Sequence, residues 1–149
     1  MKSVNYFLVI IAIYVFTSCA GSGSVSTNPA DIQGDWQLTS LDGTKLQPSG
    51  EDAAYTISFN TDSTIAGRAD CNYYAGTYTA SSAEEQGRLN LESVSATKIK
   101  CGEQSRYDEF IQSVQNAQSF QVAGGNQLVL SGSDANKIVF SRTEAEEEG

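Results

Sequence analysis

At the centre of this sequence lies the stretch Gly67-Arg68-Ala69-Asp70-Cys71-Asn72-Tyr73-Tyr74-Ala75-Gly76-Thr77-Tyr78-Thr79. It holds three of the seven tyrosines and one of the three cysteines of the chain. The polar residues Asp70 and Asn72 favour turns, whereas Cys71 is small and of a type that proteins usually bury. The pattern therefore predicts two short extended segments that meet in a tight corner at Asp70-Cys71-Asn72.

Further strands are expected on both sides of this corner. Apolar and polar residues alternate, in chain order, over 34–41, 55–59, 64–69, 73–80, 88–91, 119–123, 127–130 and 137–141. Such alternation is typical of strands with one buried face. The segments between them contain glycine, asparagine and aspartate, which suit tight turns. We therefore predict about eight strands, most of them in antiparallel hairpins.

Helical spacing occurs once in the chain. The apolar residues of this stripe are Tyr107, Phe110, Ile111, Val114 and Ala117. We interpret the stripe as the core-facing side of an amphipathic helix. Ser105 and Asp108 resemble a capping box at its start, with aspartate in place of the usual glutamate. One helix among many strands does not fit a repeating βαβ pattern, so an α+β fold on an antiparallel sheet is predicted.

The start of the chain has a composition of its own. Lys2 is followed by an apolar run over 6–16 and then by small residues. A helix that spans a bilayer needs about 20 residues, so this run is too short, and its length fits the apolar core of a secretory signal peptide. We therefore expect residues 1–18 to be a signal peptide that is removed on export.

The small residues end in Phe16-Thr17-Ser18-Cys19, which resembles a bacterial lipobox, the motif whose cysteine is lipidated. An ordinary signal peptide that happens to contain a cysteine is the alternative. Small and polar residues follow, and we predict a flexible tether over 19–31. Because Ala20 rather than aspartate follows the cysteine, resemblance to enterobacterial sorting favours an outer-membrane lipoprotein that faces the periplasm or the cell surface.

The composition narrows the classes of function. Acidic residues outnumber basic ones by 18 to 9, the net charge is −9, and histidine is absent. A negative chain is a poor candidate for nucleic-acid binding. Without histidine the commonest general base and zinc ligand are missing, and no Ser-His-Asp triad is possible. We expect residues 143–149, which are rich in glutamate, to form an acidic disordered tail.

Several acidic residues could in principle pair for acid–base chemistry or calcium binding: Asp42, Asp62, Asp70, Asp108 and Glu109. None of them lies in a calcium-loop pattern, and scattered acidic residues are ordinary in turns. We therefore predict no catalytic residues, no metal site and no cofactor.

Three patches of the sequence resemble the META domain family, which includes HslJ-like bacterial lipoproteins. The patches are Gly34-Asp35-Trp36-Gln37-Leu38, the stretch 67–78, and Thr97-Lys98-Ile99-Lys100-Cys101 with the hairpin that follows the helix. They cover residues 34–141, within an expected domain at 32–142. The resemblance implies a small, strongly curved, barrel-like antiparallel sheet with one packed helix, and no established enzymatic activity. Asp70 departs from the family, which usually has glycine before the cysteine.

Cys71 and Cys101 are the other two cysteines. Exported proteins meet an oxidising compartment, where paired cysteines usually form disulfides. Two buried free thiols are the alternative, and a redox or metal role is weakly supported because two cysteines without histidine are too few for a zinc site. We predict a disulfide between them.

The favoured hypothesis is a non-enzymatic, lipid-anchored, monomeric domain of the cell envelope that binds or stabilises another envelope component. The resemblance adds a role in a stress response. Tyr73, Tyr74 and Tyr78 are the candidate binding surface, because aromatic residues dominate interface hot spots; packing within the sheet is the alternative for them. An enzyme or enzyme inhibitor that uses the Cys71 corner is the second hypothesis.

Overall fold

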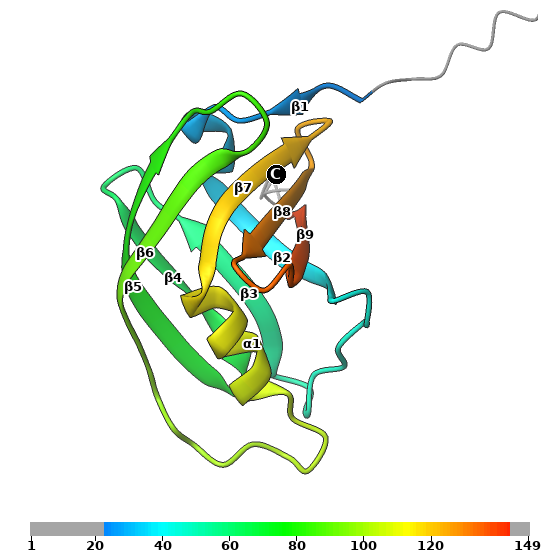
Figure 1. The fold of residues 1–149 in the computed structure, drawn as a ribbon. Coiled ribbons are helices and arrows are strands. Elements are labelled where there is room, and N and C mark those ends of the chain that lie inside the picture. Colours follow the sequence, from blue (N-terminus) through cyan, green and yellow to red (C-terminus); the bar gives the residue numbers. More distant parts are fainter. Residues whose placement is uncertain (1–22, 144–149) are drawn as a thin grey trace, which may run out of the picture.

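The computed structural model of the protein describes residues 23–143, which are built around a closed antiparallel β-barrel (Figure 1). Its strands are β2 (Gly34–Leu41), β3 (Ala54–Phe59), β4 (Thr64–Asp70), β5 (Asn72–Ser81), β6 (Gly87–Ala96), β7 (Ala117–Ala123), β8 (Gln127–Gly132) and β9 (Lys137–Arg142). They are hydrogen-bonded in the order β7-β6-β5-β4-β3-β2-β9-β8, and a β7–β8 pairing closes the ring. The predicted α+β, barrel-like fold with one packed helix is confirmed.

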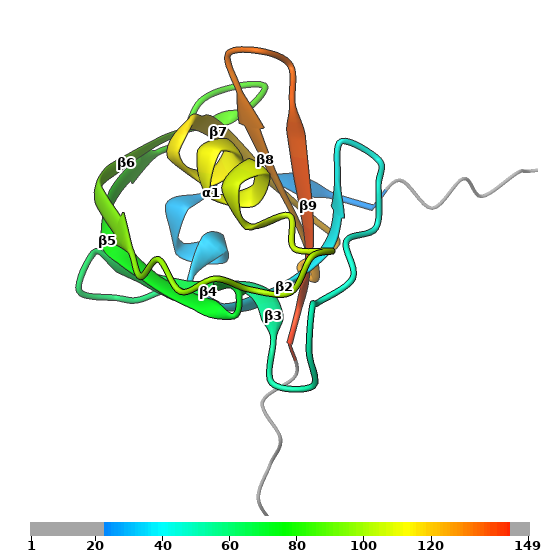
Figure 2. The same cartoon turned by 90° about the horizontal axis from the view of Figure 1, so that it is seen from below.

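A short helical segment lies at each end of the barrel (Figures 1 and 2). The α-helix α1 (Tyr107–Gln115) covers one end and buries Phe110, Ile111 and Val114. The 3-10 helix η1 (Pro29–Ile32) lies at the other end, where the indole nitrogen of Trp36 donates a hydrogen bond to the Ile32 carbonyl at 2.7 Å. In the part of the chain that the structure describes, no helix has the length and apolar character needed to cross a membrane.

The barrel interior is a packed core centred on the helix residue Phe110. Its ring makes edge-to-face contacts with Tyr55, Tyr74 and Phe140, at centroid distances of 5.2, 6.1 and 6.3 Å. Such contacts stabilise a core beyond the burial of apolar area alone. The apolar stripe predicted from helical spacing therefore belongs to the core, and α1 is fixed to the barrel by its aromatic anchor.

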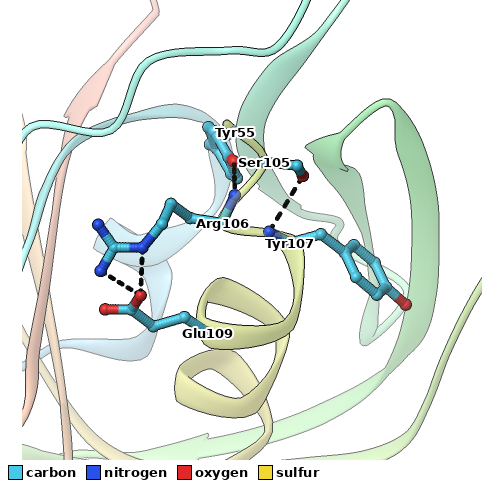
Figure 3. Close-up of polar contacts among 5 residues, drawn as sticks. All are labelled: Tyr55, Ser105, Arg106, Tyr107 and Glu109. Atoms are coloured by element: carbon cyan, nitrogen blue, oxygen red, sulfur yellow. Dashed lines mark hydrogen bonds and ion pairs between the residues drawn. The ribbon is translucent and has the colours of Figure 1, made fainter. Parts of the chain in front are cut away.

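The start of α1 differs from the predicted capping box (Figure 3). Arg106 is the N-cap residue and makes no side-chain cap. Its backbone N–H instead donates to the Tyr55 hydroxyl at 3.0 Å, and its side chain forms an ion pair with Glu109. The Ser105 hydroxyl accepts from the N–H of Tyr107 at 3.3 Å. The helix start is thus satisfied by a core tyrosine, a partner that local sequence does not indicate.

The N-terminal boundary of the fold also differs from prediction. Strand β1 (Val25–Ser26) pairs with β7 at Ala123 and Val122, and the Thr27 hydroxyl donates to the Ala83 carbonyl at 2.8 Å. The expected tether over 19–31 is therefore too long, because residues from β1 onward belong to the domain. The physical reason is that this end of β7 has no pairing with β6 and is completed by β1.

Strand β6 is longer than the predicted 88–91 and runs on to Ala96. Its register against β5 shifts opposite Ala75 and Thr77, and Ser93 has a positive φ of 54°. This β-bulge places an extra residue in the strand and breaks the alternation of apolar and polar residues. The sequence after residue 91 therefore lacks a strand pattern although the strand continues.

Candidate functional site: the Cys71 corner and the groove beside it

The predicted corner is the connection between β4 and β5. Ala69 pairs with Asn72, so the chain reverses at Asp70 and Cys71. Asp70 has a φ of 59°, in the left-handed region that glycine adopts at no steric cost and aspartate tolerates better than most residues. Asp70 therefore takes a backbone conformation that glycine would adopt without strain.

Cys71 and Cys101 form the predicted disulfide, with a Cα–Cα distance of 5.6 Å. This distance is ordinary for a disulfide. The bond closes a sequence separation of 30 residues, which include β5, β6 and the loop that leads to α1. It therefore attaches that loop covalently to the β4–β5 corner.

The side chain of Asn72 holds the same loop by hydrogen bonds. It is fully buried. Its Oδ1 accepts from the N–H of Ile99 at 2.7 Å and from the Thr97 hydroxyl at 2.8 Å. Its Nδ2 donates to the Ile99 carbonyl at 3.0 Å and to the Cys101 sulfur at 3.3 Å. The carboxamide thus gives Ile99 both of the hydrogen bonds that a neighbouring strand would supply.

Sequence reasoning interpreted Asn72 only as a turn residue and missed this role. The available signal was its position beside Cys71 in the patch that most specifically resembles the family. The partner segment around Ile99 is distant in sequence, so the pairing itself could not be seen.

The carboxylate of Asp70 is also used inside the corner. It is fully buried, and its Oδ1 accepts from the N–H of Ser49 at 2.7 Å. Burial raises the pKa of this carboxyl, but the polar groups of Ser105 and Ser49 and the nearby charge of Arg68 outweigh it, so the pKa lies below its usual value. Asp70 is therefore ionised at neutral pH, and its Oδ1 ties the loop of Ser49 to the corner, whereas its buried Oδ2 has no hydrogen-bond partner.

The expectation that Tyr73, Tyr74 and Tyr78 form one exposed surface is wrong for two of them. Tyr73 is 58% exposed, whereas Tyr74 and Tyr78 are 3% and 7% exposed. The buried hydroxyls donate to the carbonyls of Thr56, at 2.6 Å, and Asn60, at 2.9 Å. Alternate residues of a strand point to opposite faces, so Tyr74 and Tyr78 face the core together and Tyr73 faces solvent.

Tyr73 does not stand alone on the outer surface. The guanidinium of Arg68 lies over its ring, 4.8 Å from the centroid, a cation–π arrangement across the β4–β5 pair. Its backbone is bonded to the segment before Cys101, because the N–H of Thr97 donates to the Tyr73 carbonyl at 2.9 Å. Two residues further along that segment Ile99 is 62% exposed.

A groove of about 780 Å³ lies between residues 94–101 and α1. On the barrel side it is lined by Val94, Ala96, Lys98, Ile99 and Lys100, and on the helix side by Tyr107, Asp108, Ile111, Gln112 and Gln115. The groove exists because β6 pairs with β7 only at Gly87 and Arg88 and then diverges from it. Sequence reasoning missed the groove, since no local pattern shows where two strands separate.

The remaining predicted positions lie apart from the corner or outside the described residues. Asp42 accepts from the N–H of Lys137 at 2.7 Å, and Asp62 accepts from the hydroxyl of Thr64 at 2.6 Å. The hydrogen bonds from Thr64 lower the pKa of Asp62. Among residues 23–143 no group of three or more histidine, cysteine, aspartate or glutamate side chains could hold a metal ion. Cys19, the predicted lipidation site, lies outside the described residues.

Comparison of the chain with models of known protein families shows a match. The family model for the META domain matches residues 30–145. The chain therefore belongs to the META domain family, as the three sequence patches predict.

Solved structures share the fold at low sequence identity. An NMR structure of a protein from Burkholderia xenovorans has a TM-score of 0.61 at 18% identity, over 80% of this chain and 90% of that one. A second NMR structure gives 0.55 at 18% identity, over 74% and 89% of the two chains. A crystal structure of a DUF4847 family protein from Bacteroides vulgatus gives 0.50 at 17% identity, over 77% and 96%. The comparison with curated proteins found no match.

Proposed function

We propose that this META domain is a lipid-anchored, non-enzymatic protein of the bacterial cell envelope that binds another envelope component through its corner surface. We define the corner surface as Tyr73, Ile99 and the groove between β6 and α1. The observation that carries the proposal is the exposure of Tyr73 and Ile99, at 58% and 62%, on two segments that are cross-linked to each other. Exposed apolar side chains on a rigid frame bind partners with little loss of conformational entropy.

The rigidity of this surface comes from three kinds of contact. The disulfide joins Cys71 to Cys101, the Asn72 carboxamide holds both backbone groups of Ile99, and the Thr97 N–H is bonded to Tyr73. Because the backbone of these segments is fixed before any partner arrives, little backbone entropy is lost on binding. A surface built in this way favours a binding function.

The position of the corner surface agrees with an anchor near the start of the chain. Strand β1 lies at the η1 end of the barrel, and α1 lies at the opposite end (Figure 1). A lipid on Cys19 would hold the β1 end near the membrane and direct the groove away from it. An anchored domain also meets its partner at a raised local concentration, which compensates for weak affinity.

Two features of the corner favour binding over catalysis. The carboxylate of Asp70 is fully buried and bonded to Ser49, and the sulfur of Cys71 is joined to Cys101. An enzyme that used this corner would need an accessible acid or a free thiol. The Cys71 sulfur is instead used in the cross-link, and the Asp70 carboxylate lies inside the corner, where its Oδ1 holds the loop of Ser49.

The proposal is tested by photo-crosslinking in cells with the full chain. A photoreactive residue at position 73 or 99 should give a discrete adduct with an envelope component, identified by mass spectrometry. The control is position 25, because Val25 is 56% exposed but lies at the other end of the barrel, on β1. Equal labelling from all three positions, or none from 73 and 99, would contradict the proposed surface.

A further inference from the structure

We propose that the groove takes an extended, acidic polypeptide segment of the partner, which adds as a strand to the free edge of β6. This inference rests on the proposed function and specifies the chemistry of the partner. It starts from the pairing of β6, which is complete on one side only. Strand β6 pairs with β5 from Arg88 to Ala96, but with β7 only at Gly87 and Arg88.

The backbone groups of the unpaired edge point into the groove. The side chain of Gln115 donates to the Val94 carbonyl at 3.4 Å, so that carbonyl faces α1. The N–H of Thr97 donates to Tyr73 on β5, and successive N–H groups of a strand alternate in direction. The N–H of Ala96 therefore points to the groove side. An open edge of this kind is a template for another strand.

The groove admits a single extended segment better than a second copy of this domain. Helix α1 lies alongside the free edge, and two of its side chains reach across to β6 and the segment after it. The Gln115 amide reaches the Val94 carbonyl, and the Tyr107 hydroxyl donates to the Thr97 carbonyl at 3.2 Å. A folded barrel cannot enter between the strand and the helix, whereas one strand can replace these side-chain bonds with backbone bonds.

The groove floor is partly apolar and can contact alternate side chains of such a segment. Val94 and Ala96 are half-buried residues of β6, and Ile111 faces them from the helix. Successive side chains of an added strand point to opposite faces, so every second residue would contact this apolar floor. The partner segment is therefore expected to carry β-branched or aromatic residues in alternation with polar ones.

The charges at the rim select an acidic segment. Lys98 and Lys100 line the rim on the barrel side, and the only ion pair among residues 23–143 joins Arg106 to Glu109. Both lysine ammonium groups are thus without a carboxylate partner in the described domain. Asp108 lies on the helix side. A glutamate or aspartate near the Lys98–Lys100 side would complement the rim, and complementary rim charges favour specific association.

The test uses short peptides selected from a displayed random library on the immobilised full chain, and then synthesised. We expect selected peptides to alternate apolar and polar residues and to contain carboxylates. Replacing both rim lysines (Lys98→Glu with Lys100→Glu) should weaken binding by about tenfold or more. Lys137→Glu, an exposed lysine outside the groove, is the matched control and should change affinity by less than about twofold.

Two readouts are specific for strand addition. The amide hydrogen of Ala96 should become protected from exchange when the peptide binds. Two sets of peptides are compared, one N-methylated at the odd-numbered residues and one at the even-numbered residues. One set should lose binding and the other should keep it, because only every second backbone N–H pairs with β6. A peptide that binds with both N-methylated sets, binding insensitive to the lysine reversals, or a dimer of the chain that excludes peptide would overturn the proposal. The crosslinks from position 73 would still stand in each case, so failure here is distinct from failure of the proposed function.

Discussion

The carboxamide of Asn72 replaces a neighbouring strand for Ile99. Its oxygen accepts the Ile99 N–H at 2.7 Å, and its nitrogen donates to the Ile99 carbonyl at 3.0 Å. The Asn72 side chain is fully buried although the Ile99 side chain is exposed, and a hydrogen bond lost at a buried group costs free energy. One side chain therefore fixes the loop that forms the rim of the groove, and the Cys–Asn pair of this chain has an architectural function.

This arrangement predicts the effect of removing the amide. Asn72→Ala should lower the free energy of unfolding by about 2–4 kcal/mol, because two backbone groups and a hydroxyl lose their partner. The measurement is urea denaturation followed by tryptophan fluorescence. Asn90→Ala is the matched control, since Asn90 is exposed and its amide reaches only Glu92. A loss in Asn72→Ala no larger than in the control would show that the amide does not hold the loop.

The disulfide gives a second prediction for stability. Replacing both cysteines (Cys71→Ser with Cys101→Ser) should lower the free energy of unfolding by about 3–4 kcal/mol, as expected for a loop of this length on the chain-entropy model. Reducing agent should destabilise the wild type by a similar amount and leave the double variant unchanged. Unreduced protein that shows two free thiols by mass spectrometry would contradict the cross-link itself.

The buried carboxylate of Asp70 predicts a pH dependence. Its pKa in the folded protein lies below the ordinary value of 3.8, so ionisation stabilises the fold above that pH. This contribution is lost as the pH falls from the ordinary value through the lower folded value. The difference in unfolding free energy between the wild type and Asp70→Asn should therefore be largest near neutral pH and shrink below about pH 4. A difference that stays constant across this range would mean that Asp70 acts only through its shape and hydrogen bonds.

Much of the barrel could be predicted from sequence because alternation reports the two faces of a strand. The positions of β2, β3 and β5 follow from it, and so does the helix stripe around Phe110. The same alternation separates Tyr73 from Tyr74, yet it cannot say which of two faces is buried when both carry aromatic rings. That choice depends on Phe110 and Phe59, which meet the inner tyrosines only in the folded barrel.

The parts that could not be predicted depend on contacts between distant segments. Ser93 lies in a bulge whose extra residue hides the end of β6 from a periodic pattern. Val25 is in a region of tether-like composition, but it is ordered by a free stretch of β7. The groove arises from the divergence of β6 and β7, so its residues carry no common signal along the chain.

The neighbouring residues Tyr73 and Tyr74 on β5 predict different effects, one on partner binding and the other on stability. Tyr74→Phe should lower the free energy of unfolding by about 1–2 kcal/mol, because the Thr56 carbonyl loses a buried hydrogen-bond donor. Tyr73→Ala should leave the thermal midpoint nearly unchanged, since the ring is exposed, and should weaken partner capture in the crosslinking assay. Denaturation of both variants measures the contribution of each tyrosine to the core, and crosslinking measures its contribution to the binding surface. Unfolding of Tyr73→Ala would place this residue in the structural frame and remove it from the binding surface.

The lipid anchor can be tested on Cys19 directly. Phe16-Thr17-Ser18-Cys19 follows an apolar run of signal-peptide length, so cells labelled with a fatty-acid analogue should tag the wild-type protein and not Cys19→Ala. The barrel should fold in both, because the buried apolar core of residues 23–143 is built from Ile32 onward. Cys19→Ala should then lose membrane attachment and, with it, the local concentration that assists binding, so crosslinks from position 73 should become fewer without a change in their partner. A tagged Cys19→Ala protein would exclude this cysteine as the lipidation site, and an untagged wild type would favour an ordinary cleaved signal peptide.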